Sequence, residues 1–124
     1  MVIERGDRVL LVQRPDDDDD LPGVWGLPAA TLAEDESEQD AVRRAGREKL
    51  GVDLRPLEAV GSAGFMTDFR AEIVRGEPTV QRGGANTQYA EVKWGSLADL
   101  VPAAREGSLC SRVLLRARGV DWGE

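Results

Sequence analysis

The sequence contains no histidine and a single cysteine, Cys110. Without histidine, the chain cannot form Ser-His-Asp or Cys-His nucleophile pairs, and it cannot bind zinc through histidine. A single cysteine allows no disulfide within the chain, which favours a cytoplasmic location. A hydrolase made from this sequence must therefore work with carboxylates, lysine or a metal ion.

Long apolar runs are also missing. No stretch approaches the roughly 18 consecutive apolar residues of a membrane-spanning helix, so we expect no membrane partner. The opening stretch, MVIERGDRVLLVQRP, carries charges inside any apolar segment, which argues against a signal peptide. The length of 124 residues fits one domain, which we expect to cover residues 1–124.

Positive charge is scarce relative to negative charge. The net charge is −7, and residues 1–50 carry a net charge of −6 against −1 for residues 51–124. Such a chain offers no broad basic surface for a nucleic-acid backbone, so we expect no nucleic-acid partner. An acidic half can still bind phosphate groups if a divalent cation lies between them, although solubility alone also explains the charge.

The apolar pattern predicts a mixed sheet with helices. We expect the tail of a first strand at VIE, further strands at 8–14, 52–65, 67–75 and 88–95, and helices at 37–50, 96–100 and 108–119. The aspartate run PDDDDD is typical of a solvated loop rather than a metal site. Residues 21–30 are typical of an ordered turn segment. The order of elements predicts an α+β fold with helices on both faces of the sheet.

One helix carries a charged stripe next to a loop carboxylate. In the helix predicted at 37–50, Asp40, Arg44 and Glu48 are spaced four residues apart and share a face. Glu36 lies in the loop that leads into this helix. These groups either converge on one site or form ordinary ion pairs on an exposed helix, and the spacing alone favours the second interpretation.

The segment at 30–52 resembles the Nudix box of MutT-like hydrolases, written G-x5-E-x7-R-E-U-x-E-E-x-G-U, where U is a bulky aliphatic residue. The matching residues are Glu36, Arg44, Glu48, Gly51 and Val52. The flanks VLLVQRP, LPGVWGLPA and YAEVKWGSLADL also resemble the family, although little of its usual first strand is present. The resemblance covers almost the whole chain and implies the Nudix fold, an α/β/α sandwich with a mixed sheet between helices.

Several box positions depart from the family pattern. Ala29 and Ala30 stand where glycines are usual, and Gly46 replaces an aliphatic residue. Ala45 and Lys49 replace two glutamates. Because the family's glutamates bind a divalent metal ion at the diphosphate, these departures predict weakened catalysis.

The resemblance implies hydrolysis of a nucleoside diphosphate linked to another group, with Mg²⁺ or Mn²⁺ as cofactor. Glu48 is the expected catalytic residue and metal ligand, and the backbone carbonyl of Ala29 is a second expected metal ligand. Arg44 and Glu36 complete the expected catalytic set as orienting groups.

Lys49 and Gln88 are the expected substrate-binding residues. Lys49 either neutralises a phosphate directly or is an ordinary surface residue. A loose alignment places Gln88 where the family often has a carboxylate, and Glu34, Glu38 or Glu91 would compensate. The sequence thus predicts a weakened Nudix hydrolase or, alternatively, a catalytically inactive Nudix-fold domain that binds a nucleotide or a protein, with a homodimer also considered.

The remaining apolar and aromatic residues predict packing. The residues expected in the core are Trp25, Trp94 and one face of the last helix, namely Leu109, Val113, Leu114 and Ala117. Phe65, Phe69 and Tyr89 could stack on a base, but single aromatic residues among strands more often pack. Without a histidine to activate it, Cys110 is expected to be a small buried hydrophobe.

Overall fold

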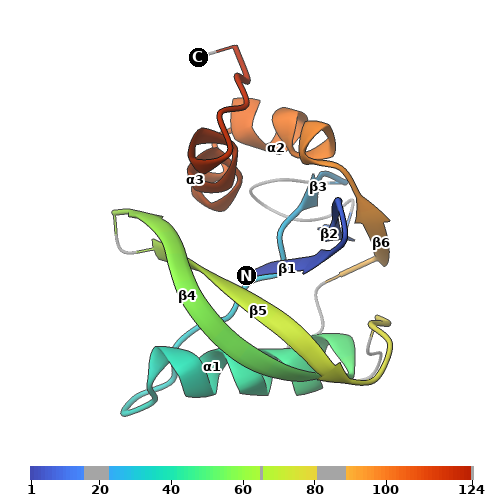
Figure 1. Cartoon of the computed structure of the whole chain (residues 1–124), viewed down its shortest axis with the longest axis vertical. Coiled ribbons are helices and arrows are strands. Elements are labelled where there is room, and N and C mark those ends of the chain that lie inside the picture. Colours follow the sequence, from blue (N-terminus) through green and yellow to red (C-terminus); the bar gives the residue numbers. More distant parts are fainter. Residues whose placement is uncertain (16–22, 65, 81–88, 124) are drawn as a thin grey trace.

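The computed structural model describes residues 1–15, 23–64, 66–80 and 89–123 (Figure 1). The strands within these ranges are β1 (Val2–Arg5), β2 (Arg8–Gln13), β3 (Trp25–Gly26), β4 (Asp53–Ala63), β5 (Met66–Arg75) and β6 (Glu91–Gly95). The helical segments are α1 (Glu38–Ala45), η1 (Gly46–Leu50), η2 (Leu97–Leu100), α2 (Val101–Arg105) and α3 (Leu109–Ala117). Each predicted element has a counterpart, the short β3 is added within the segment predicted as a turn, and α2 continues beyond the short helix predicted at 96–100.

The sheet is mixed, as predicted. β2 pairs antiparallel with β6 from Val9 to Gln13, with β1 at its start and with β3 at its end. β1 pairs in parallel with β5, where Val2 lies opposite Arg70, and β5 pairs antiparallel with β4. Because the register of β1 begins at Arg70, the first residues of β5 extend beyond the start of β1.

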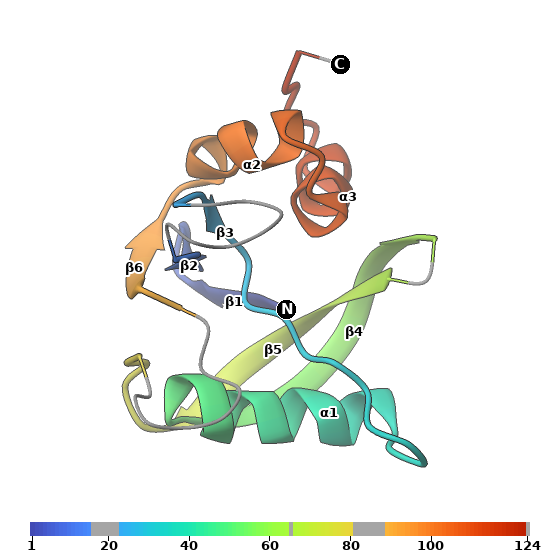
Figure 2. The same cartoon turned by 180° about the vertical axis from the view of Figure 1, so that it is seen from behind.

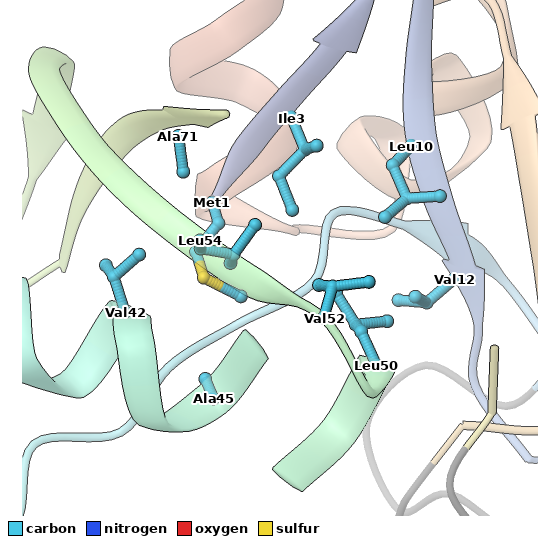
Figure 3. Close-up of a cluster of buried hydrophobic side chains, with 10 residues drawn as sticks. All are labelled: Met1, Ile3, Leu10, Val12, Val42, Ala45, Leu50, Val52, Leu54 and Ala71. Atoms are coloured by element: carbon cyan, nitrogen blue, oxygen red, sulfur yellow. The ribbon is translucent and has the colours of Figure 1, made fainter. Parts of the chain in front are cut away.

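Helices cover both faces of the sheet because β1 and β2 are apolar on both sides. Ile3, Leu10 and Val12 belong to a buried cluster with α1 and η1 (Figure 3). Their sequence neighbours point to the opposite face, as the two-residue period of a strand requires. On that face they form a second buried cluster, which includes Val2, Val9, Leu11, Leu100, Leu114 and Leu115. The cartoon shows α1 on one side and α2 and α3 on the other, which confirms the predicted α/β/α sandwich (Figures 1 and 2).

α1 and η1 form one helical segment from Glu38 to Leu50, as the sequence predicted. The Ser37 hydroxyl caps its start by accepting a hydrogen bond from the Asp40 N–H at 3.1 Å. Gly51 ends the segment in the left-handed conformation, with φ of 68°, which favours glycine. The last turn, η1, is a π-helix, a widened form that is frequent at functional sites.

The close approach of β4 explains the glycine in the middle of this helical segment. A Cβ atom at Gly46 would lie 2.7 Å from Cγ of Leu54 and 3.1 Å from the carbonyl oxygen of Val52. Glycine costs about 1 kcal/mol relative to alanine inside a helix. Here that cost is offset by the packing of Leu54 directly against the helix backbone.

The predicted apolar face of α3 is wrong at both ends. Val113 and Leu114 are buried as expected, but Leu109 is 46% exposed and Ala117 is exposed. Leu115 is fully buried instead. α3 packs against β4 and β5, and its buried apolar residues lie in the middle of the helix.

The two tryptophans expected in the core lie at its margin. Trp25 and Trp94 are half-buried, each packed against one of the two clusters. The Lys93 ammonium lies 4.3 Å from the ring centre of Trp25, and the Arg5 guanidinium lies 4.4 Å from that of Trp94. These cations cover the exposed ring faces, as expected for cation–π pairs. Within the described residues, no helix is long and apolar enough to cross a membrane.

Candidate functional site

Arg44 organises the residues that lead into α1. Its guanidinium binds the Glu36 carboxylate through two hydrogen bonds of 2.9 and 2.8 Å, and it donates to the Thr31 carbonyl at 2.6 Å. The Ala33 N–H also donates to Glu36, at 3.0 Å. Such a bidentate pair fixes the geometry of the loop as well as its charge. Arg44 and Glu36 are therefore paired and fixed at the start of the helix, while their orienting role stays a prediction.

The same contacts set the charge states of this pair. Hydrogen bonds from Arg44 lower the pKa of Glu36 to about 2, with a further contribution from the Ala33 N–H. The hydrogen bond to Glu36 raises the pKa of Arg44 in return. Both side chains are therefore fully ionised across the physiological pH range.

Glu48 is the third member of this charged group. Its carboxylate accepts a hydrogen bond from Arg44 at 3.2 Å, and its side chain is 43% exposed. Asp40, which shares the predicted stripe, instead accepts a hydrogen bond from Arg43 at 2.9 Å. The structure therefore brings Glu36, Arg44 and Glu48 together and leaves Asp40 outside the group.

Lys49 lies against the loop before the helix. Its ammonium donates to the Ala29 carbonyl at 2.9 Å and lies 5.7 Å from the ring centre of Tyr89. The Tyr89 hydroxyl accepts a hydrogen bond from the Ala29 N–H at 3.0 Å. The half-buried Lys49 is thus held in a specific position, unlike an ordinary surface lysine. Tyr89 packs against this loop rather than standing free for stacking.

Burial lowers the pKa of the Lys49 ammonium. The positive charge of Arg44 lowers it further, while Glu48 opposes the shift. The charged form of Lys49 is therefore less stable here than in water. An anion bound at this ammonium would restore that lost stabilisation.

The described residues offer a divalent cation few free ligands while Lys49 holds this position. The Ala29 carbonyl, an expected metal ligand, accepts the hydrogen bond from Lys49. Glu48 is a single carboxylate and is already paired with Arg44. Among the described residues, no three acidic, histidine or cysteine side chains are grouped closely enough to hold a metal ion. Gln88 and the aspartates at 16–20 lie outside the described residues.

Ala45, which stands where the family pattern has a glutamate, is part of the hydrophobic core. Its side chain is 1% exposed and belongs to the cluster under α1 (Figure 3). A glutamate at this position of the present fold would place a carboxylate among apolar side chains. Of the two residues that replace glutamates of the family pattern, Ala45 therefore belongs to the core, whereas Lys49 belongs to the candidate site.

A cavity of about 550 Å³ adjoins the contact between Lys49 and Ala29. The sequence predicted neither this cavity nor the buried carboxylate in its wall. Its wall includes Ala29 and also Asp68, whose side chain is completely buried. Neither carboxylate oxygen of Asp68 has a partner at good hydrogen-bond geometry among the described residues, although the Cys110 thiol lies close enough to lower its pKa. The one available signal was a carboxylate inside the strand predicted at 67–75.

Charged and reactive groups near this carboxylate are few. Burial raises the pKa of Asp68, and the ammonium of Met1, which donates to the Pro28 carbonyl, opposes that rise. Burial also raises the pKa of the Cys110 thiol, which lines the same cavity. Cys110 is therefore a protonated, half-buried group, in line with its expected role as a small hydrophobe.

Known proteins resemble the chain in sequence and in structure. The family model of the NUDIX domain matches residues 1–116. The NAD-capped RNA hydrolase NudC of Pseudomonas aeruginosa is 31% identical over 120 residues, which cover 92% of this chain and 41% of NudC. The CTP pyrophosphohydrolase of Escherichia coli is 38% identical over 61 residues, 49% of this chain and 44% of that protein.

A solved structure supports the fold independently. The NUDIX hydrolase from Nitrosomonas europaea matches with a TM-score of 0.71 at 19% identity, covering 95% of this chain and 84% of that chain. At this identity the likeness concerns the fold. The chain spans about two fifths of the length of the NudC relatives that it matches.

Proposed function

Because this chain belongs to the Nudix family, we propose that it binds a nucleoside diphosphate linked to another group and hydrolyses the diphosphate slowly. The observation that carries this proposal is the 2.9 Å contact between the Lys49 ammonium and the Ala29 carbonyl. The family pattern has a glutamate at position 49. Here the opposite charge stands beside Glu48, where a phosphate group is expected.

The electrostatics of Lys49 support phosphate binding. Its lowered pKa shows that the ammonium is under-stabilised, because burial and Arg44 both oppose its charge. A diphosphate placed at this point would supply the missing negative charge. Arg44 is held by Glu36 and Thr31, so we assign it to the rigid frame of the site rather than to the ligand.

The slow rate follows from the same substitution. Nudix hydrolases generally use divalent metal ions, and we propose Mg²⁺ or Mn²⁺ for this chain. The Lys49 charge would repel such an ion next to Glu48. If the change removes about 4 kcal/mol of transition-state stabilisation, the rate falls roughly a thousandfold.

We propose a small nucleotide derivative rather than a nucleic acid as the ligand. The NudC relatives are named for NAD-capped RNA, but a net charge of −7 disfavours contacts to an RNA backbone. Comparing NAD with NAD-capped RNA at equal concentration would test this choice. The cytoplasmic location and the homodimer remain predictions of the sequence.

The Lys49 contact also favours a second function, a catalytically inactive Nudix-fold domain that binds a nucleotide. In this alternative, Lys49 replaces the metal ion as the cation at the diphosphate, and no hydrolysis follows. The two functions differ in one measurement, because only the first gives phosphate release that depends on Mg²⁺ or Mn²⁺.

Hydrolysis should be measured with ADP-ribose, NAD and CTP in the presence of Mg²⁺ or Mn²⁺. We expect slow product release that is lost in Glu48→Gln and retained in Arg47→Gln. Arg47 is a matched control because it lies on the same turn, 67% exposed, and pairs with Asp53. Activity that Glu48→Gln leaves intact would contradict a catalytic role for this helix. Complete absence of activity would favour the binding domain.

Binding should be measured with ADP in EDTA. We expect residual affinity without metal, because Lys49 itself carries the positive charge. Lys49→Gln should lower that affinity roughly tenfold, as expected for the loss of one charge-assisted contact of about 1.4 kcal/mol, while Arg47→Gln should not. If EDTA abolishes ADP binding to the unmodified chain, the lysine is not the phosphate-binding cation.

A further inference from the structure

Ala29 lies at the centre of a group of three residues from distant parts of the chain. Its N–H donates to the Tyr89 hydroxyl at 3.0 Å, and its carbonyl accepts from the Lys49 ammonium at 2.9 Å. Tyr89 and Lys49 also meet each other, because the ammonium lies 5.7 Å from the centre of the Tyr89 ring. The three residues therefore connect the loop before α1, the end of the helical segment and the chain that enters β6.

Tyr89 is the firmly anchored member of this group. The next residue, Ala90, donates its N–H to the Gln13 carbonyl at 2.8 Å, and β6 pairs with β2 from Glu91 onward. The half-buried Tyr89 ring packs against the cluster under α1. Because the sheet holds the backbone and the cluster holds the ring, the hydroxyl has a defined position.

Ala29 is the member that needs to be held. It lies in the segment 27–37, which belongs to no helix or strand, so no regular hydrogen-bond ladder fixes its carbonyl. Only the torsions φ and ψ separate the N–H of a residue from its carbonyl. The hydrogen bond from the Ala29 N–H to Tyr89 therefore narrows the directions in which the carbonyl can point.

A fixed carbonyl in turn fixes Lys49. A lysine side chain is a flexible four-carbon stem, and ordering it when a ligand binds costs conformational entropy. In this chain the contacts to Ala29 and to the Tyr89 ring order the ammonium before any ligand arrives. An ammonium has three N–H donors, and the Ala29 carbonyl engages one, so the others can reach phosphate oxygens while that contact persists.

We propose that Tyr89 is a positioning residue, whose hydroxyl holds Ala29 and thereby keeps the Lys49 ammonium where a phosphate group binds. The inference rests on the proposed function, which assigns that phosphate to Lys49. Tyr89 acts through Ala29 and Lys49, and it lies outside the segment that resembles the Nudix box. The sequence suggested only packing or base stacking for this residue.

The first test is calorimetric titration of ADP in EDTA with Tyr89→Phe, which keeps the ring and removes the hydroxyl. We expect the affinity to fall about fivefold, the effect of one lost hydrogen bond. The double variant Tyr89→Phe/Lys49→Gln should bind ADP within about twofold of Lys49→Gln alone, because the hydroxyl acts through that lysine.

Val92→Ala is the control for a purely structural effect. Val92 is another half-buried residue that packs against the cluster under α1, and it makes no contact with Ala29 in the hydrogen bonds described above. Trimming it should lower the melting temperature because packing is lost. The affinity for ADP should stay unchanged.

A second measurement follows Lys49 without any ligand. The chain has two lysines, Lys49 and Lys93, so ¹³C labelling of lysine gives two sets of NMR signals. Lys93 is the internal control, because it lies over Trp25, which packs against the second cluster. In Tyr89→Phe, the order parameter of the Lys49 Cε should fall below about 0.6, the range of flexible groups, while that of Lys93 stays unchanged.

Four results would each overturn the inference. Tyr89→Phe binds ADP as tightly as the unmodified chain, or its loss multiplies with that of Lys49→Gln in the double variant. Val92→Ala loses as much ADP affinity as Tyr89→Phe does, or the order parameter of Lys49 is the same with and without the Tyr89 hydroxyl.

A failure of the proposed function gives a different pattern. If EDTA abolishes ADP binding while Tyr89→Phe still mobilises Lys49, the hold on the lysine is supported and the phosphate site is contradicted. If Lys49→Gln lowers ADP binding in EDTA and Tyr89→Phe does not, the positioning role of Tyr89 alone is contradicted.

Discussion

Glu36 and Asp68 lie near the same loop but meet opposite environments. Glu36 accepts hydrogen bonds from Arg44 and Ala33, and its pKa falls to about 2. Asp68 is completely buried, has no hydrogen-bond partner among the described residues, and has a raised pKa. The carboxylate with many partners is committed to holding the loop. The carboxylate of Asp68 instead carries the cost of its burial, which raises its pKa.

The largest effect should come from creating a second buried carboxylate without partners. Ala45→Glu places a charge where the present side chain is 1% exposed, and we expect it to lower the free energy of unfolding by about 3 kcal/mol or more. Urea unfolding measures this change. Ala117→Glu, at an exposed position of α3, is the matched control and should change stability by less than about 0.5 kcal/mol. Equal stability of the two variants would show that burial at position 45 has been misjudged.

A smaller effect should follow when Glu36 loses its partner. Arg44→Gln removes the bidentate pair, so the pKa of Glu36 should rise from about 2 toward its ordinary value of 4.5. A lowered folded-state pKa stabilises the protein above the ordinary value, and that stability is lost as the pH falls toward 2. The variant should therefore melt several degrees lower at pH 7 but lose less stability on acidification. NMR titration of Glu36 checks the pKa directly, and an unchanged value contradicts the assignment.

The smallest effect should come from Asp68→Asn. Because the pKa of Asp68 is raised above 3.8 in the folded state, Asp68 stays protonated to a higher pH in the native state than in the unfolded state. Stability conferred by Asp68 is therefore present at low pH and is lost as the pH rises through the folded-state pKa. At pH 8 the variant should melt slightly higher than the unmodified chain, and the difference should vanish near pH 4. Thermal melts across this range decide it, and a lower melting temperature at pH 8 would show that Asp68 has a partner.

The sequence predicted the sheet and helices well because their signals are local. Val9 to Val12 form an apolar run buried on both faces, and Gly51 ends the helix in a conformation that glycine favours. Both ends of α3 were misjudged because periodicity cannot show how far along the helix its apolar face stays covered. Burial in a fold decides such cases, and burial depends on residues far apart in the chain.

The candidate site was predicted in part. The positions of Glu36, Arg44 and Glu48 follow from helical spacing and a short loop, and the structure brings all three together. The contact from Lys49 to Ala29 and the cavity around Asp68 depend on how loops and strands meet in space. No spacing along the chain encodes those meetings.

The packing of Gly46 against Leu54 has a consequence for how such a sequence can change over generations. A side chain at position 46 would need the space that Leu54 fills, since a Cβ there would lie 2.7 Å from its Cγ. An aliphatic residue at 46 therefore requires Leu54 to shift or to be replaced by a smaller residue. We expect the effects of substitutions at the two positions to be coupled rather than additive.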